Sequence, residues 1–566
     1  MSENSSAAMS VKAMISRFAI MLGAAGLVGF GGVNWGGLTS NQAVACAVFI
    51  AIIFGTLFFW GFRLAIAFLG LAVLIFTQSL TVPTFVTSAS LEVIMFLVGM
   101  MIIVGALRDL GFFTWIVQLI VSMPNLNGKK FIFVTATASA LLACAVDEVT
   151  SIIFISTLIF QVSDRLKLNA TPYILIAVLA TNIGSAGTMM GNPVGIYIGT
   201  KGQLSFGDFM MWSFPVMLVS LLTVIAVLIW YFRKDLALFD IRLQERLERG
   251  LSIAPKVEVP YLNGLILIVI TVVAIASHHQ LEDGLGLMPN SVLLVMPLIC
   301  AGIVMILKPD RARHYVEKEV DWWTLVFFML LFAVAGTLEH THVDKVMADG
   351  FSKICGTETN VLVPFIFTVS AFGSAFVDNV IFVAAFSPVI EQLSVTVKDL
   401  PLWWALLFGA CFGGNITMIG STANIVALGM LEKHGGSKIT FFQWFKIGLL
   451  CTVISGVISV GALLAFQKYM PDHKITVDKM VKTPGEYHGQ NAKFTGTLLA
   501  ADGNVFIAVK GKAQKIYRIK TVLPDKGKEF IGKVVTVSGV LQEDKNNPDC
   551  RYHLTPKEIV PVESEK

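Results

Sequence analysis

Long apolar runs recur along this sequence and decide which solvent the chain folds in. Each run is long enough to cross the roughly 30 Å hydrocarbon core of a bilayer as a helix. Of the 566 residues, 55% are hydrophobic and 14% are charged, and the mean hydropathy is +0.74. We therefore predict an all-α polytopic membrane protein. The expected spans are 17–33, 42–60, 64–80, 91–107, 172–199, 211–232, 261–277, 291–307, 322–339, 403–430 and 443–466.

Two further apolar blocks, 131–163 and 361–392, are each interrupted near the middle by acidic residues. The first contains Asp147 and Glu148, and the second contains Asp378. A block that enters the membrane, turns at its polar centre and returns is a re-entrant hairpin. Irregular backbone at that depth is tolerated only beside a protein-enclosed cavity. We therefore expect each hairpin tip to lie at such a cavity, near the bilayer midplane.

The two blocks belong to an internal repeat. Residues 146–149 read VDEV and residues 377–380 read VDNV, at an offset of 231. Further along, 184–196 (GSAGTMMGNPVGI) matches 413–425 (GGNITMIGSTANI) at an offset of 229. Two motifs in the same order and at nearly the same separation predict two copies of one structural unit.

The distribution of basic residues predicts the orientation of the spans. Six Lys and Arg lie in 233–257 and four in 308–320, whereas 278–288 has none. Because basic loops stay in the cytoplasm, the first two linkers are expected inside and the third outside. Counting along the spans places the N-terminus in the cytoplasm and makes the hairpins enter from opposite sides, as in an inverted repeat. The protein is then expected in the cell (inner) membrane, with its C-terminal region in the periplasm or outside the cell.

Glycine-rich stretches interrupt two of the expected spans. The first contains Gly184, Gly187, Gly191, Asn192, Pro193 and Gly195, and the second contains Gly413, Gly414, Gly420 and Ser421. Such residues break a helix through backbone freedom, proline chemistry or local side-chain bonding. The freed carbonyls of a broken helix can coordinate Na⁺, and the N-terminus of a half-helix can hold an anion. Close helix packing through small residues is the alternative interpretation.

The three intramembrane acids are candidates for ion coupling. Carboxylates within a membrane serve as proton relays or cation ligands. Asp147 and Glu148 are adjacent and lose hydration together, so we expect them to share a proton that can be exchanged for Na⁺. Helix capping by Asp147 and Asp378 is the alternative role, and it is compatible with ion binding.

The VDEV and VDNV tips and the two glycine-rich stretches resemble the ion transporter superfamily. Over about 40–466 they are similar to its branch of arsenite permeases, the melanosomal P protein, NhaD-type sodium/proton antiporters and citrate-transporter-like permeases. The resemblance implies two inverted repeats, each with a re-entrant hairpin and a broken helix, in a homodimer with an elevator mechanism. The site that it implies is Asp147, Asn182, Thr188, Gly191 and Asn192 from the first repeat and Asp378, Asn379, Asn415, Thr417, Ser421 and Asn424 from the second. Glu148 stands where relatives often have Asn, and it joins the predicted site because of its charge.

The charges at the expected site favour a cation. No Lys or Arg lies in an expected site helix, whereas three acids do. The Ser-Asn-Thr signatures that carboxylate transporters use for Na⁺ and substrate are also absent as such. We therefore expect a secondary active transporter coupled to Na⁺ or H⁺, most simply a cation/proton antiporter. The alternative is an anion or metalloid permease for arsenite, citrate or dicarboxylate, driven by Na⁺ or H⁺.

The last part of the chain changes to alternating polar and apolar residues. KFTGTLLA, NVFIAVK, QKIYRIK and KVVTVSGVL are separated by turn sequences, which predicts a small, OB-like β-barrel. OB-folds often bind oligonucleotides, but Phe506, Tyr517 and Tyr552 are too few for a stacking platform. We therefore expect an accessory or regulatory module outside the membrane rather than a nucleic-acid partner.

The expected domains follow from these patterns. They are N-terminal transmembrane helices in 1–90, a first inverted repeat in 91–232, cytoplasmic linkers and connecting transmembrane helices in 233–320, a second inverted repeat in 321–468 and the OB-like domain in 474–566. No nucleophile–base pair, metal constellation or nucleotide-binding loop is recognisable. We expect no enzyme and no cofactor beyond the transported or coupling Na⁺ and H⁺. A channel would need no inverted repeat, so the repeat favours a transporter over a channel. The expected partners are lipid, a small ion and a second copy of the chain.

Overall fold

Two structural units make up the chain. The computed structural model describes residues 11–252, 259–285, 291–356, 358–394, 397–435, 439–470, 480, 491–501, 504–510, 516–522, 529–544, 546 and 551–561. A helical unit comprises Met1–Ala276 and Leu294–Pro471, and a barrel unit comprises Ser277–Leu293 and Asp472–Lys566. All the motifs singled out for ion coupling lie in the helical unit.

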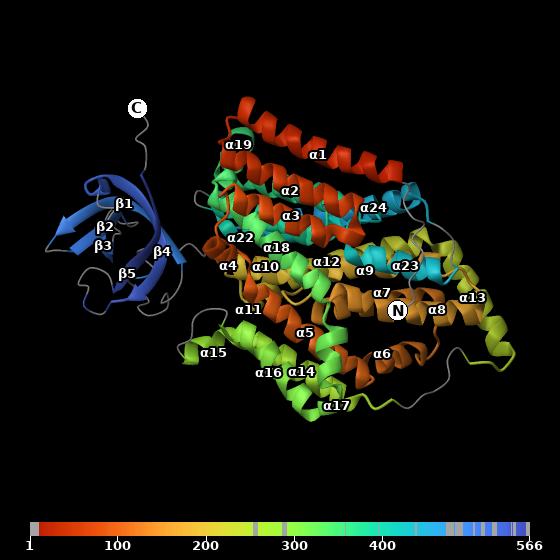
Figure 1. Ribbon diagram of the computed structural model, residues 1–566. Helices are drawn as coiled ribbons and strands as arrows, with labels where there is room; N and C mark the ends of the chain where they lie inside the picture. Colours follow the sequence, from red (N-terminus) through yellow and green to blue (C-terminus); the bar gives the residue numbers. More distant parts are fainter. Residues whose placement is uncertain are drawn as a thin grey trace. The chain divides into compact units, whose positions relative to one another are not determined.

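Four helices precede the repeated part of the chain. They are α1 (Val11–Asn34), α2 (Ser40–Phe58), α3 (Arg63–Phe76) and α4 (Val82–Ser88), with the 3₁₀ turn η1 (Trp60–Phe62) between α2 and α3. Thr39 and Gln42 form a capping box that starts α2, because each side chain accepts the backbone N–H of the other residue. α1 packs on α2 and α2 packs on α3 (Figure 1). Only 11% of the apolar window of α1 is buried, as expected for a helix that faces lipid.

The first repeat contains a long helix, a short helix, a hairpin, a broken helix and a final long helix. Its elements are α5 (Leu91–Asp109), α6 (Phe112–Val121), α7 (Gly128–Ala145), α8 (Glu148–Leu166), α9 (Thr171–Gly184), α10 (Pro193–Lys201), α11 (Phe206–Asp208), the π-helical turn η2 (Phe209–Ser213) and α12 (Phe214–Tyr231). Asn127 caps α7 by accepting the backbone N–H of Lys130 at 2.9 Å.

The second repeat reproduces this order. Its elements are α18 (Trp322–His340), α19 (Val343–Cys355), α20 (Thr359–Phe376), α21 (Asn379–Leu393), α22 (Asp399–Gly413), α23 (Thr422–Lys433) and α24 (Phe441–Phe466). Even the joint before the short helix is repeated. Gly111 precedes α6 with φ 75°, and His342 precedes α19 with φ 62°, at the same offset of 231 as the hairpin tips. A left-handed residue turns the chain sharply between the long and the short helix in both copies.

The acid-interrupted blocks form helical hairpins, as predicted. The break between α7 and α8 contains Asp147, and the break between α20 and α21 contains Asp378. The glycine-rich stretches break helices in the same way, because 185–192 separates α9 from α10 and 414–421 separates α22 from α23. The sequence motifs therefore lie at the interruptions of both repeats.

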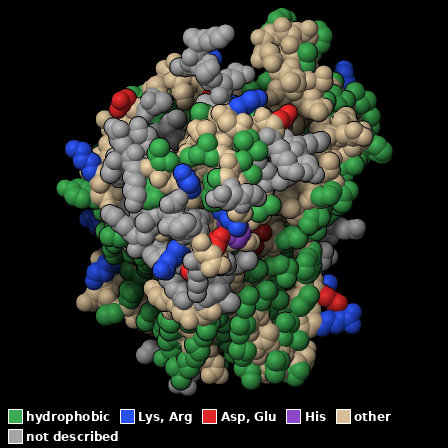
Figure 2. Space-filling view, turned by 90° about the vertical axis from the view of Figure 1, so that its left-hand side faces the viewer, with side chains coloured by type: hydrophobic (Ala, Val, Ile, Leu, Met, Phe, Trp, Pro, Cys, Tyr) green, Lys and Arg blue, Asp and Glu red, His purple; other side chains and the backbone are tan. Residues whose placement is uncertain are grey.

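A connecting segment joins the two repeats. It contains α13 (Arg233–Glu248), α14 (Leu262–Ala276), α15 (His278–Leu285), α16 (Ser291–Leu307), α17 (Pro309–His314) and the π-helical turn η3 (Tyr315–Glu319). Within the described residues, nine helices are long and apolar enough to cross a membrane. On the face that Figure 2 shows, hydrophobic side chains lie together over much of the lower part, with few charged side chains among them. This is the surface of an integral membrane protein.

Close helix packing depends on glycines at repeated positions. A Cβ on Gly184 would meet the backbone of Ala140 in the hairpin helix α7, and a Cβ on Gly413 would meet Ala371 in α20. Each broken helix therefore lies against the first arm of its own hairpin with no room for a side chain. In the second repeat, Gly448 of α24 lies against the carbonyl group of Asn415.

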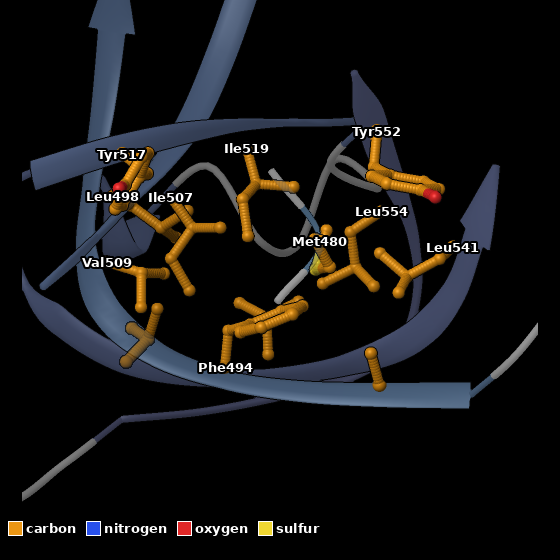
Figure 3. Close-up of a cluster of buried hydrophobic side chains, with 13 residues drawn as sticks. Met480, Phe494, Leu498, Ile507, Val509, Tyr517, Ile519, Leu541, Tyr552 and Leu554 are labelled. Carbon is orange, nitrogen blue, oxygen red and sulfur yellow. The ribbon is translucent and has the colours of Figure 1, made fainter. Parts of the chain in front are cut away.

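The barrel unit contains five strands that close on themselves. They are β1 (Asn491–Ala501), β2 (Asn504–Lys510), β3 (Ile516–Thr521), β4 (Val534–Glu543) and β5 (Tyr552–Pro561). Their order around the barrel is β1-β2-β3-β5-β4, with β3 and β5 parallel. Figure 3 shows Phe494, Ile507 and Ile519 pointing into the apolar interior, where all three are buried. The predicted β-barrel is confirmed, because alternate residues of each strand supply its core.

The glycine in α24 provides a test of this packing. We expect Gly448→Ala to destabilise the helical unit by about 1–3 kcal/mol, because the added methyl group would be forced against the Asn415 carbonyl oxygen. Gly461→Ala in the same helix is the matched control, since nothing lies within 4 Å of its Cβ position. Thermal unfolding of both purified variants in one detergent measures the difference, and equal midpoints would contradict the close contact.

Candidate functional site

The acid at each hairpin tip caps the second helix of its hairpin. Asp147 Oδ1 accepts the backbone N–H groups of Val149 at 2.7 Å and Thr150 at 3.1 Å. Asp378 Oδ1 accepts the N–H of Val380 at 3.0 Å. These bonds satisfy N–H groups that a helix start leaves without an intrahelical partner. The capping role that the sequence offered for both acids is confirmed, and it leaves the second oxygen of each carboxylate for other partners.

The second oxygen of Asp378 reaches the broken helix of its own repeat. Thr422 Oγ1 donates to Asp378 Oδ2 at 3.0 Å. Thr422 is the first residue of α23, so this bond joins the hairpin tip to the half-helix beside it. The sequence motifs did not single out Thr422, although it directly follows the predicted Ser421.

Glu148 connects the two repeats. Its side chain is buried, with 7% of the residue exposed, and its Oε1 accepts a hydrogen bond from Ser421 Oγ at 3.3 Å. Ser421 caps the half-helix α23 by accepting the N–H of Ala423 at 3.1 Å. The other oxygen, Oε2, has no hydrogen-bond partner among the described residues. A buried carboxylate with one unused acceptor therefore lies where the first hairpin meets the second broken helix.

A cluster of three asparagines also joins the repeats. Asn182 Nδ2 donates to Asn415 Oδ1 at 2.8 Å and to Asn424 Oδ1 at 2.9 Å. Asn424 Nδ2 donates in turn to the carbonyl oxygens of Gly414 at 2.7 Å and Thr417 at 2.9 Å. None of the three asparagines is exposed. Asn182 Oδ1 is a further buried acceptor without a partner in the described part of the chain.

The glycine-rich loop of the first repeat makes one more contact between repeats. Asn192 caps α10 by accepting the N–H of Gly195 at 2.9 Å. Its Nδ2 donates to Ser185 Oγ at 3.1 Å and to Cys411 Sγ of the second repeat at 3.3 Å. Neither Ser185 nor Cys411 is among the site residues predicted from the sequence.

In each repeat, one threonine joins the glycine-rich loop to the hairpin by the same kind of hydrogen bond. Thr188 Oγ1 donates to the carbonyl oxygen of Cys144, and Thr417 Oγ1 donates to that of Ala375. Both acceptors lie shortly before a hairpin tip, so the tip and the broken helix of each repeat are held together. Gly191 belongs to the first loop, where a Cβ would meet the backbone of Ser185.

The predicted residues therefore fall into two sets. One set makes the contacts between repeats and contains Glu148, Asn182, Asn192, Asn415, Ser421 and Asn424. The other set makes contacts within one repeat and contains Asp147, Thr188, Gly191, Asp378, Asn379 and Thr417. Asn379 Oδ1 accepts a hydrogen bond from Ser374 Oγ at 3.1 Å. Within the described residues, no group of three or more His, Cys, Asp and Glu is arranged to hold a metal ion.

Arg63 is a buried cation that sequence patterns did not assign to the site. Only 5% of the residue is exposed, and the guanidinium lies over the Trp60 ring at 3.8 Å from its centroid. Nη2 donates to Thr324 Oγ1 at 3.1 Å, while Nε has no partner among the described residues. The carboxylates that act on it electrostatically are those of Asp378 and Asp321. A basic residue at the end of a span reads as an interfacial anchor, and only the fold shows that this one is enclosed.

The two repeats also interlock at the ends of the half-helices. Lys201, which ends α10, lies 3.9 Å from Glu391 of α21 and 3.5 Å from Glu339 of α18. His434, which follows α23, lies 3.0 Å from Asp164 of α8. Each half-helix therefore ends against the second hairpin arm of the other repeat.

The asparagine cluster can be tested by removing its donor. We expect Asn182→Ala to destabilise the helical unit by about 1–3 kcal/mol, because the buried amide oxygens of Asn415 and Asn424 lose a donor. Asn34→Ala is the control, because that exposed side chain donates to the nearby carbonyl oxygen of Phe30 and to no other described residue. Thermal unfolding checks both variants, and equal losses would show that the asparagine cluster adds nothing to the contact between repeats.

Comparison with known proteins supplies the family. The family model described as citrate transporter matches residues 49–409. An uncharacterized transporter of Mycobacterium bovis is 31% identical over 389 residues, covering 68% of this chain and 87% of that protein. The 46 kDa membrane protein of Mycobacterium leprae is 29% identical over 388 residues, with coverages of 68% and 88%. The P protein of Homo sapiens is 24% identical over 445 residues, with coverages of 66% and 53%.

A solved structure is also similar. The YdaH transporter of Alcanivorax borkumensis aligns with a TM-score of 0.46 at 15% identity, covering 71% of this chain and 89% of that one. The family match extends from α2 into α22 and so contains both hairpins. Together with the P protein, it confirms the resemblance to this branch of the ion transporter superfamily. The chain is a membrane transporter that belongs to the citrate transporter family.

Proposed function

We propose that this protein is a secondary active transporter that couples solute movement to a proton or Na⁺ bound at Glu148. The observation that carries the proposal is the buried Glu148 carboxylate, which bridges the two repeats through Ser421 and keeps Oε2 without a partner. No ion pair to Glu148 exists among the described residues.

The chemistry of the unused atoms supports a positively charged occupant. An ionised carboxylate that is buried without a counter-charge costs several kcal/mol. A proton on Oε2, or a cation beside it, removes that cost. The other unused acceptor in the centre, Asn182 Oδ1, is also an oxygen, and oxygen atoms are the ligands that hard cations prefer. Because a bound proton or cation removes this cost from the part of the protein that carries Glu148, the movement of that part is expected to depend on whether Glu148 is occupied.

Alternating access completes the proposal. α8 packs on α23 and α10 packs on α21, so the hairpins and broken helices of both repeats form one interlocked body. We propose that this body moves as an elevator against the remaining helices, within a homodimer in the cell (inner) membrane. The N-terminus is cytoplasmic and the C-terminal barrel lies outside in this proposal, because the basic linkers predict that orientation.

Two kinds of transported solute are compatible with ion coupling at Glu148. A cation exchanged for protons is the first, because Glu148 and the two hairpin aspartates present negative charge and Glu148 Oε2 is an unused oxygen acceptor. Citrate is the second, because the matching family model is described as citrate transporter and Arg63 supplies a buried positive charge. Three acids would repel a multivalent anion, so citrate would enter together with H⁺ or Na⁺.

Everted vesicles with a pH-sensitive dye test the first solute. Adding Na⁺, Li⁺ or K⁺ is expected to alkalinise vesicles that contain the parent protein, because the cation exchanges for internal protons. Glu148→Gln and Asp378→Asn are expected to abolish the response, since each amide keeps the side-chain shape and loses the charge. Glu245→Gln is the control, because Glu245 forms its ion pair with Arg242 at the surface of α13, where both side chains are 45% exposed.

Proteoliposomes test the second solute with the same variants. If no cation changes the dye signal, antiport is wrong, and labelled citrate uptake under an imposed pH or Na⁺ gradient becomes the measurement. The parent is then expected to accumulate citrate, and Glu148→Gln is expected to make uptake independent of the gradient. Unchanged coupling in Glu148→Gln, in either assay, would overturn the role proposed for this carboxylate.

A further inference from the structure

A groove opens on the helical unit, away from the asparagine cluster. Its volume is about 390 Å³, and it lies between the start of α7, the end of α12 and the segment that follows α6. Lys129 and Lys130 line its edge, and the remaining lining is mostly apolar. The groove therefore combines a cationic rim with a hydrophobic interior.

The cationic rim is open to a ligand. Both lysines are exposed, and neither forms an ion pair with a described acidic residue. Lys130 Nζ donates to the carbonyl oxygen of Asn125 at 3.1 Å, which leaves its other two protons available. The first N–H of α7 is already taken, because Gly128 N donates to Asp240 Oδ1 at 2.6 Å. An anion in the groove would thus be held by the lysine side chains rather than by the helix terminus.

The interior suits an acyl chain. The apolar lining is supplied by Met123, Phe133, Val134 and Ile229. Phe133 is 44% exposed, as expected for a side chain that faces lipid. The end of α12 adds a marker of depth. Trp230 directly follows Ile229 and is 63% exposed, and exposed tryptophan at the end of a span is typical of the membrane–water interface. The groove therefore lies at the level where lipid headgroups meet acyl chains.

We propose that this groove binds an anionic phospholipid, with the phosphate at Lys129 and Lys130 and an acyl chain along Phe133, Val134 and Ile229. Paired lysines attract anionic headgroups over zwitterionic ones, and the apolar lining favours a lipid over a soluble phosphate. A lipid bound in the groove would lie against α7, the first arm of the hairpin that carries Asp147. This site is separate from the coupling site and does not depend on it.

Lipid binding to the purified full-length protein tests the proposal. Dioctanoyl phosphatidylglycerol, dioctanoyl phosphatidylcholine and glycerol 3-phosphate are titrated separately, and bound molecules are counted by native mass spectrometry. Phosphatidylglycerol is expected to bind more tightly than the other two. Lys129→Gln with Lys130→Gln is expected to weaken its binding roughly 10- to 30-fold, from the attraction of two basic residues for an anionic lipid.

Matched variants separate the contributions. Lys345→Gln with Lys353→Gln removes two exposed lysines from α19 and is expected to leave binding unchanged, whereas Lys129→Arg with Lys130→Arg is expected to retain it. Phe133→Ala is expected to weaken binding of the lipid and not of glycerol 3-phosphate. Equal binding of phosphatidylcholine, or of glycerol 3-phosphate, to the parent would overturn the proposal, as would full binding by the double glutamine variant.

Discussion

The hydrogen bonds from Asn182 to Asn415 and Asn424 hold the two repeats together at their centre. An amide buried without partners is costly, so each of these side chains fixes the position of the others. The backbone of Asn415 is also held by α24, because Trp444 Nε1 donates to the Asn415 carbonyl oxygen at 3.0 Å. The broken helices of both repeats meet at this centre, and Thr188 and Thr417 join the same broken helices to the hairpin tips.

Capping and bridging divide the three acids into different roles. In Asp147 and in Asp378, one carboxylate oxygen accepts a backbone N–H at the start of a helix. This bond fixes the hairpin tip whether or not an ion is bound. The Glu148 side chain does not cap a helix, and it accepts a hydrogen bond from Ser421 in the other repeat. The residue that departs from the usual hairpin motif is thus the one that links the repeats.

Much of this arrangement is predictable from sequence because it depends on local chemistry. Acids inside apolar blocks and glycine-rich interruptions determine where helices stop, so the hairpins and broken helices follow directly from them. Contacts between distant residues are different. The Glu148–Ser421 bond spans 273 residues, and no local pattern indicates it. The burial of Arg63 is equally invisible to a local pattern, since it depends on Thr324 and Phe327 of α18.

Glu148 and Asn379 occupy equivalent positions in the two repeats, 231 residues apart. In two identical chains related by symmetry, that position would hold either two acids or two amides. Because both copies lie in one polypeptide, the equivalent position can carry a carboxylate in the first repeat and a neutral amide in the second. Asn379 bonds within its own repeat, so the bridging charge is single. A single chain with two repeats can thus hold an odd number of acidic side chains at a centre where two identical copies would hold an even number.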